Sequence, residues 1–165
     1  MAHTGKKELL IDWLRDAYAI ELALTQILDN QAKRAEPFAH VQSRLRGHLE
    51  ETRRHADTVK ACIERNGGNV SRLKSGFARI FGEVQSQSLG SSVEHVIKDA
   101  TMSAAAEQYE IATYRVIIRL AEEVGDLKTK QACEEILRDE EAMAKWIDAE
   151  LEGLVRKTVE QAGLQ

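Results

Sequence analysis

Four glutamates have a spacing that suits a metal centre. Glu21 and Glu51 are 30 residues apart, Glu110 and Glu140 are also 30 apart, and one offset of 89 relates the two pairs. The midpoint of the first pair lies beside the only proline, and that of the second falls on Gly125. Proline and glycine are turn residues, so each pair fits two carboxylates at equal height on the arms of a helical hairpin. Four carboxylates at one level would form an oxygen-rich cage for two divalent cations.

Imidazole groups lie close to one of these glutamates. In His48-x-x-Glu51-x-x-x-His55 the three side chains share one helical face, although Thr52 competes with Glu51 for the inward position. Mixed carboxylate and imidazole ligands suit iron or manganese, and zinc is an alternative. We therefore expect two divalent metal ions, iron foremost, bound by Glu21, Glu51, His55, Glu110 and Glu140, with Glu107 and His48 as further candidates. Whether His48 or His55 is the histidine ligand stays open.

A structural role is the alternative interpretation of these glutamates. One glutamate in an apolar stripe is weak evidence for a metal, because it can form a salt bridge or reach solvent. Buried carboxylates can also be paired with arginines, and the chain offers Arg15, Arg44, Arg54, Arg115 and Arg138. Four glutamates related by one offset and centred on two turn signals favour the metal cage.

Long helices are expected to position these side chains. Residues 6–34 carry an apolar seam of period 3.5, typical of a bundle helix, and Glu21 interrupts its middle. Pro37 suits the first turn of a second helix, which reaches a stop at about Asn66 in Asn-Gly-Gly-Asn. A third helix begins after a cap at Ser91 or Ser92 and a fourth runs from a cap at Asp126 to about residue 161.

The segment between the two hairpins is too long for a tight turn. Residues 67–90 are rich in glycine and serine around a short amphipathic piece from Arg72 to about Val84. Two antiparallel hairpins joined by one long crossover form the ferritin-like four-helix bundle. We therefore expect an all-α fold, with residues 1–165 forming a single domain.

Composition excludes several classes of function. The net charge of −4 argues against general nucleic-acid binding, and no apolar run approaches the roughly 18 residues of a membrane span. The N-terminus shows no apolar region of a signal peptide. Cys62 and Cys133 both fall in helical patterns and are interpreted as reduced, buried thiols of a cytoplasmic protein.

Four sequence blocks carry a resemblance to a known family. They are Leu9-x-x-x-Trp13-Leu14-Arg15-Asp16-Ala17-Tyr18-Ala19-x-Glu21, His48-Leu49-x-Glu51-Thr52, Glu107-Gln108-Tyr109-Glu110-Ile111-Ala112-x-Tyr114 and Ile136-Leu137-x-Asp139-Glu140-Glu141-x-Met143-Ala144-x-Trp146. Together they resemble the YciE/YciF family of small bacterial ferritin-like proteins linked to stress responses, and they are more similar to the YciE branch. The resemblance covers about residues 6–155. It implies a ferritin-like four-helix bundle, a cytoplasmic location and a homodimer.

The wider ferritin-like pattern implies ligands from all four helices, but this chain departs from it. The usual second-helix motif is Glu-x-x-His, whereas Arg54 follows Glu51 at that spacing and His55 comes one residue late. In the fourth helix Ala144 stands at the position equivalent to His55. Glu107 or His48 could compensate. The departure puts full ferroxidase or oxidase chemistry in question more than metal binding.

Two functional hypotheses follow. The first is a di-iron or di-manganese carboxylate protein that acts on Fe²⁺, O₂ or peroxide in stress protection, as a ferroxidase-type or peroxidase-type oxidoreductase. The second is a non-catalytic dimeric bundle, a stress-response or interaction module that has lost full di-metal chemistry. Ala144 is the feature that favours the second hypothesis.

Overall fold

The described residues form four long α-helices. The structure is a computed structural model that describes residues 2–70 and 92–161, with side chains for 5–70 and 94–160. The helices are α1 (Ala2–Arg34), α2 (Ala39–Arg65), α4 (Ser92–Val124) and α5 (Leu127–Gln161). The expected crossover, including its amphipathic piece, falls largely outside the described residues, as does the cap expected at Ser91 or Ser92. Of the described helices, none is long and apolar enough to cross a membrane.

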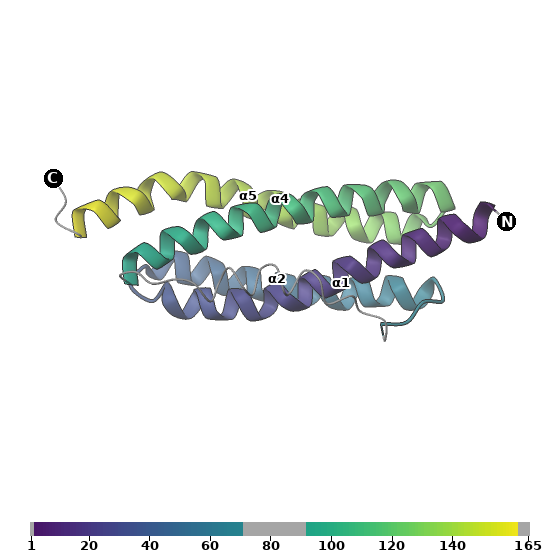
Figure 1. The fold of residues 1–165 in the computed structure, drawn as a ribbon, viewed down its shortest axis with the longest axis horizontal. Helices are drawn as coiled ribbons and strands as arrows, with labels where there is room; N and C mark the ends of the chain where they lie inside the picture. Colours follow the sequence, from purple (N-terminus) through teal and green to yellow (C-terminus); the bar gives the residue numbers. More distant parts are fainter. Residues whose placement is uncertain (1, 71–91, 162–165) are drawn as a thin grey trace.

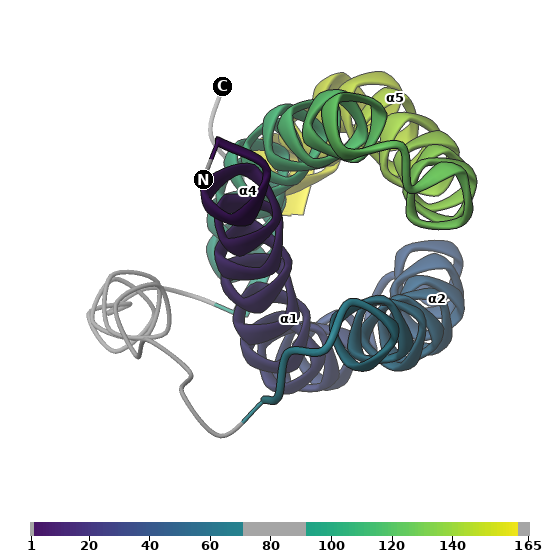
Figure 2. The same cartoon turned by 90° about the vertical axis from the view of Figure 1, so that its right-hand side faces the viewer.

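The four helices are arranged as two antiparallel hairpins. α1 packs along α2 and α4 packs along α5, while α1 also contacts α4 and α2 contacts α5 (Figure 1). Viewed along the bundle, the helices therefore surround a common interior in the order α1, α2, α5, α4 (Figure 2). This arrangement confirms the all-α fold of two hairpins expected from the sequence.

Local sequence explains where the helices end. Gly67 and Gly125 have φ values of +82° and +75°, the left-handed conformation that glycine adopts without strain at helix ends. The Asp126 carboxylate accepts a hydrogen bond from the backbone N–H of Thr129 at 3.1 Å, which confirms it as the cap of α5.

The turn between α1 and α2 differs in detail from the expectation. Pro37 lies in the turn, and α2 begins two residues later at Ala39. Phe38 supplies the reason, because its backbone N–H closes the turn onto the carbonyl of Ala35 at 2.8 Å. Its ring is also buried against the core, so the chain is anchored at Phe38 before the helix starts.

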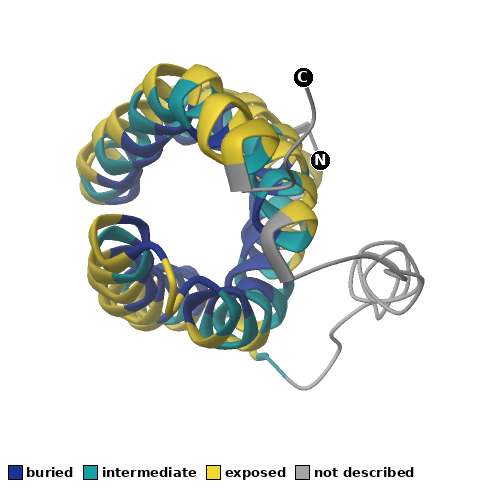
Figure 3. Cartoon of the chain, turned by 90° about the vertical axis from the view of Figure 1, so that its left-hand side faces the viewer, coloured by how far each residue is buried: buried dark blue, intermediate teal, exposed yellow. Residues whose placement is uncertain are grey.

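The buried residues of the four helices lie on the faces that surround the common interior (Figure 3). One cluster lies where the start of α1 meets the end of α4, around Leu14, Ile63 and Ile117. The other lies where the end of α1 meets the start of α4, around Leu28, Val96 and Met143. Both cysteines belong to the first cluster as buried free thiols, as expected. Between the two clusters, a small apolar group of Ile20, Leu24 and Ala106 lies on α1 and α4 beside buried polar side chains.

Candidate metal centre

Six ionisable side chains from all four helices converge in the middle of the core. Each is almost inaccessible to solvent, with relative exposures of 3% or less. α1 contributes one carboxylate, α2 two imidazoles, α4 two carboxylates and α5 one carboxylate. The members are Glu21, His48, His55, Glu107, Glu110 and Glu140, which we call the central cluster.

One half of the central cluster lies between α1, α2 and α5. The Nδ1 atom of His55 is 2.8 Å from Oε1 of Glu140 and 3.8 Å from Oε1 of Glu21. One ligand atom from each of these residues lies within 4.8 Å of the other two. These three side chains could therefore hold one cation.

The other half lies between α2, α4 and α5. The Nε2 atom of His48 is 3.2 Å from Oε1 of Glu107 and 3.6 Å from Oε2 of Glu140, and these three residues form a second group within 4.8 Å. Glu140 belongs to both groups, with a different oxygen nearest each histidine. Its carboxylate therefore lies where it could bridge two cations.

Glu110 completes the cluster without belonging to either group. Both of its carboxylate oxygens are buried, and neither has a hydrogen-bond partner among the described residues. Burial raises the pKa of Glu110 well above its usual value, and the charges of Glu140, Glu21 and Glu107 raise it further. Glu110 therefore faces the other carboxylates of the cluster.

The central cluster holds every buried, unpartnered polar side-chain atom in the part of the chain that the structure describes. They are Glu21 Oε2, His55 Nδ1, Glu107 Oε2, both Glu110 oxygens and both Glu140 oxygens. The short His55–Glu140 approach thus lacks the geometry of a hydrogen bond. Leaving such atoms unpaired costs free energy, and native proteins rarely do so without a reason. Cations held by the two ligand groups could serve as partners for several of them.

Burial controls the protonation of the cluster. It raises the pKa of Glu21 to about 8, with help from the charge of Glu140, and the pKa of Glu107 to about 7. Burial acts in the same direction on Glu140, but the close approach of His55 and the positive charges of His48 and His55 outweigh it and lower the pKa of Glu140. Glutamates whose pKa is raised hold protons near neutral pH, and a divalent cation can displace those protons.

Glu51 lies at the edge of the cluster. A quarter of its side chain is exposed, and its carboxylate contacts Nδ1 of His48 at 2.9 Å and the guanidinium of Arg44 at 3.0 Å. The hydrogen bond with His48 is the largest cause that lowers the pKa of Glu51 to about 2. Glu51 is therefore placed to orient His48, as outer carboxylates orient metal-binding histidines.

Helix geometry explains why Glu51 is at the edge. The buried positions of α2 include Leu45, His48, Thr52, His55 and Val59. At the level of Glu51, it is therefore Thr52 that occupies the inward position. Thr52 satisfies its own hydroxyl by donating to the backbone carbonyl of His48 at 3.0 Å. Both histidines point inward as a result, whereas the sequence left open which one would.

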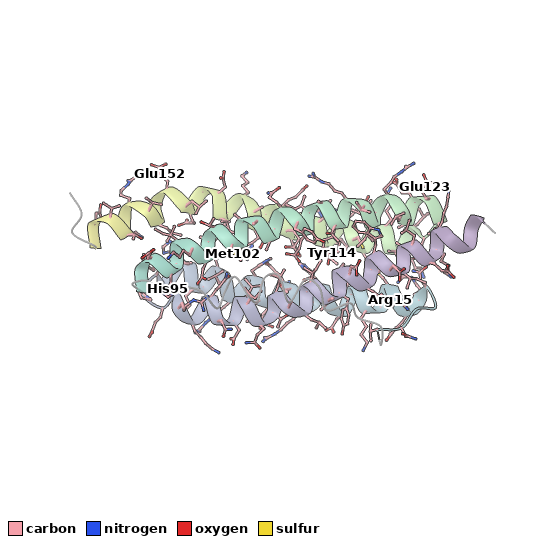
Figure 4. All side chains as sticks on the ribbon, viewed as in Figure 1. Arg15, His95, Met102, Tyr114, Glu123 and Glu152 are labelled. Carbon is pink, nitrogen blue, oxygen red and sulfur yellow. The ribbon has the colours of Figure 1, made fainter. Side chains whose placement is uncertain are left out.

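Two partners of the cluster were not recognised in the sequence. The Tyr114 hydroxyl donates a hydrogen bond to Oε1 of Glu21, and Tyr114 projects from α4 into the interior (Figure 4). The Asp139 carboxylate contacts Nε2 of His55 at 3.1 Å. The apolar seam predicts that Tyr114 points inward, but it does not identify Glu21 as its partner. Asp139 is half exposed, and apart from its position beside Glu140 nothing in the sequence around it predicts a contact with His55.

The arginines expected as alternative partners form other contacts. Arg15 pairs with Asp12 at 3.1 Å, and Arg115 pairs with Glu141 at 2.7 Å. Arg44 approaches the cluster most closely, but it contacts Glu51. Histidine is therefore the basic residue that faces the buried carboxylates.

Comparisons with known proteins agree with this architecture. The model of a family described as "Domain of unknown function (DUF892)" matches residues 5–160. Protein YciF of Escherichia coli K12 is 29% identical over 140 residues, which cover 82% of this chain and 84% of YciF. The crystal structure of YciF, which is described as a stress protein, matches with a TM-score of 0.77 over 92% of this chain and 98% of its own.

Two further solved structures extend the likeness. Protein XCC3681 of Xanthomonas campestris is 30% identical, with a TM-score of 0.84 over 96% of this chain and 99% of its own. The bacterioferritin of Desulfovibrio desulfuricans is 18% identical, with a TM-score of 0.74 over 93% and 84% of the two chains, and so shows the fold alone. The fold is thus ferritin-like, as expected, and the chain, which is similar to YciF, belongs to the DUF892 family.

Proposed function

We propose that this protein binds two divalent metal ions in the central cluster, iron foremost, and manganese or zinc as alternatives. The observation that carries the proposal is the set of unpartnered carboxylate oxygens buried between four helices. Glu21, His55 and Glu140 would hold one ion, and His48, Glu107 and Glu140 the other. Glu110, on α4, would add a further carboxylate. Glu51, also expected as a ligand, would support His48 instead.

The donor set fits such ions in both charge and type. The central cluster contains four carboxylates and two imidazoles, so two divalent cations would neutralise the four negative charges. Oxygen donors with some imidazole nitrogen suit iron and manganese. The ferritin-like pattern usually places one histidine on each of two helices, whereas here α2 would provide both. The histidine that α5 lacks at Ala144 would thus be supplied by the neighbouring helix α2.

We further propose that the protein handles Fe²⁺, O₂ or peroxide during stress. The relative YciF is described as a stress protein, and one fold neighbour is a bacterioferritin described as having a di-iron site. Iron bound here would supply one-electron redox chemistry. The protein's own residues would orient the ligands, with Glu51 fixing the ring of His48 and Asp139 that of His55. The two apolar clusters would keep bulk water from either end.

Metal analysis with matched variants tests the first part. Protein purified without chelators is expected to contain about two metal ions per chain, the number that the two ligand groups suggest. The E110Q variant should lose most of this metal, because a buried carboxylate becomes a neutral amide. The E51Q variant should bind about 10–100-fold more weakly, as expected for an orienting partner. Exposed Glu141 is the control, and E141Q should match the wild type.

A second candidate function keeps the fold without the chemistry. The absence of a histidine from the described part of α5 near Glu140 favours a non-catalytic bundle that acts as a dimeric stress-response or interaction module. Fe²⁺ oxidation and peroxide consumption by the metal-loaded protein separate the two candidates. Turnover that E110Q abolishes and E141Q preserves supports the oxidoreductase. Full metal loading without turnover supports the non-catalytic module.

Self-association and location complete the proposal. We propose a homodimer that works in the cytoplasm. Support for association comes from a fold neighbour described as a dodecameric thioferritin of Bacteroides fragilis. Support for the reducing compartment comes from the two free cysteines of this chain. Light scattering in solution would reveal the mass, and a monomer at micromolar concentration would count against the dimer.

A further inference from the structure

A pair of cysteines lies on the two helices that also carry members of the central cluster. Cys62 is seven residues after His55 on α2, and Cys133 is seven residues before Glu140 on α5. Seven residues are two helical turns, roughly 10 Å along the bundle. Both thiols are 1% exposed or less, and both belong to the apolar cluster at that end. The proposed function uses neither of them.

Contacts on both sides of the pair place Cys62 and Cys133 at the same level of the bundle. On one side, His55 contacts Glu140 at 2.8 Å. On the other side, Asn66 contacts Thr129 at 3.3 Å, four residues after Cys62 on α2 and four residues before Cys133 on α5. α2 and α5 run in opposite directions, so the same register continues between these two contacts. This register brings Cys62 and Cys133 to the same level on neighbouring helices, and both belong to one apolar cluster.

The surroundings of the two thiols differ. The guanidinium of Arg65 lies 3.6 Å from the Sγ atom of Cys62, so a positive charge adjoins this sulfur. Arg65 is held there by a 2.6 Å hydrogen bond to the hydroxyl of Thr129, and more than a third of its side chain is exposed. Burial, with the nearby charge of Cys62, raises the pKa of Cys133 above its usual range. A cation thus adjoins the sulfur of Cys62, while Cys133 is kept protonated.

We propose that Cys62 and Cys133 form a redox-active dithiol that peroxide oxidises to an intramolecular disulfide, with Cys62 as the reacting thiol and Cys133 as the resolving one. The Cys62 thiolate attacks one oxygen of hydrogen peroxide, the O–O bond breaks, and the released hydroxide takes a proton to leave as water. The Cys133 thiol then displaces hydroxide from the Cys62 sulfenic acid, forming the S–S bond and a second water. Two electrons pass from sulfur to oxygen.

The reaction changes how the two halves of the bundle are joined. Cys62 belongs to the first hairpin and Cys133 to the second, so the disulfide would link the hairpins covalently. α2 and α5 otherwise meet at this end through the contacts of Asn66 and Arg65. The reaction needs only the two thiols and peroxide, so it is independent of the proposed metal function.

Thiol counting and peptide mapping test this inference on the full chain. Anaerobically reduced, metal-free protein is treated with a small excess of hydrogen peroxide, and its thiols are counted after denaturation. The expected result is the loss of both thiols per chain and a disulfide-linked Cys62–Cys133 peptide in a chain of monomer mass. Metal-free protein is used so that a failed metal proposal cannot affect the outcome.

Three variants assign the roles of the residues. In C133S, Cys62 should accumulate as a sulfenic acid that a 1,3-dione traps. In C62S, Cys133 should keep its thiol over the same period. The R65Q variant should slow the reaction about tenfold, because it removes the positive charge beside the Cys62 sulfur, and R65K should restore most of the rate. Circular dichroism confirms that each variant is folded.

Several outcomes would overturn the inference. One is a disulfide that forms only between chains or only in denaturant. Another is equal oxidation of Cys133 in C62S and in the wild type. Thiols that stay reduced throughout the treatment would identify both cysteines as inert packing residues.

Discussion

At the scale of single residues, the central glutamates make the metal-free protein sensitive to pH. Glu21 ionises near pH 8 in the folded chain, but near its usual value of 4.5 when exposed by unfolding. Glu107 follows the same pattern with a folded pKa of about 7. Between the unfolded pKa of 4.5 and these folded pKa values, the folded state binds more protons than the unfolded state. The free energy of unfolding therefore falls as the pH rises through this range.

We therefore expect the melting temperature of the chelated protein to decrease from pH 5 to pH 8. His48 acts in the same direction, because its folded pKa of about 10 exceeds its usual 6.5, so its stabilising charge is lost as pH rises through that range. Thermal melts in matched ionic strength would measure the effect. A melting temperature that rises over this interval would contradict the protonation states described above.

Tyr114 is a second residue whose contribution can be measured. Replacing it by phenylalanine keeps the ring but leaves Oε1 of buried Glu21 without its donor. We expect Y114F to lower the free energy of unfolding by about 1–3 kcal/mol, the cost of an unsatisfied buried group. Denaturant unfolding is the measurement. Tyr109 is half exposed, so Y109F should change stability by less than about 0.5 kcal/mol.

The sequence located the central residues better than it located their neighbours. Glutamates that interrupt an apolar seam are easily recognised, and Glu21, Glu110 and Glu140 all lie in the core. The equal offsets favoured Glu51 as an inward residue, whereas the alternating steps of three and four residues in the α2 seam favour Thr52. Where two patterns compete, packing follows the seam, because burial depends on helical phase rather than on symmetry of numbering.

At the scale of elements, the start of α5 fixes how the second hairpin meets α2. The Asp126 carboxylate caps α5 and also accepts a hydrogen bond from the side-chain amide of Asn66 at 2.7 Å. Burial alone would raise the pKa of Asp126, but hydrogen bonds from Thr129 and Asn66 lower it to about 2. A single side chain thus serves a helix end and a contact between hairpins.

We expect D126A to lower the free energy of unfolding by about 1–2 kcal/mol, because it removes both the cap and the acceptor for Asn66. Urea unfolding at pH 7 measures this change, and the deficit should shrink as the pH falls from the usual Asp value of 3.8 toward the folded pKa of about 2. Asp148 is exposed in the middle of α5, so D148A is a matched control. Equal unfolding of the two variants would show that the cap contributes nothing.

Helices and their ends followed from the sequence, while their mutual contacts did not. Glycine at 67 and 125 predicted the ends of α2 and α4 through a conformational requirement that other residues rarely meet. The start of α2 was misplaced by two residues, because burial of the Phe38 ring outweighed the preference of proline for a first helical turn. Contacts such as Asn66 with Asp126 depend on how the helices pack, which no local pattern contains.

At the scale of the whole molecule, bound cations should hold the two hairpins together. A ligand that binds only the folded state, present at 100 times its Kd, adds about 2.7 kcal/mol of stability. For a chain of this size we expect Fe²⁺ or Mn²⁺ under these conditions to raise the melting temperature by roughly 5–11 °C. Differential scanning calorimetry is the measurement. The increase should disappear in E110Q and persist in E141Q.

The division of donors between the hairpins has a consequence for assembly. Both imidazoles and one carboxylate come from α1 and α2, while three carboxylates come from α4 and α5. Neither half alone supplies all six side chains, so the proposed metal site would be complete only when the two hairpins pack together. Formation of the native interior would then depend on the supply of free metal around the nascent chain, so a cell starved of that metal would accumulate loosened, protease-sensitive copies.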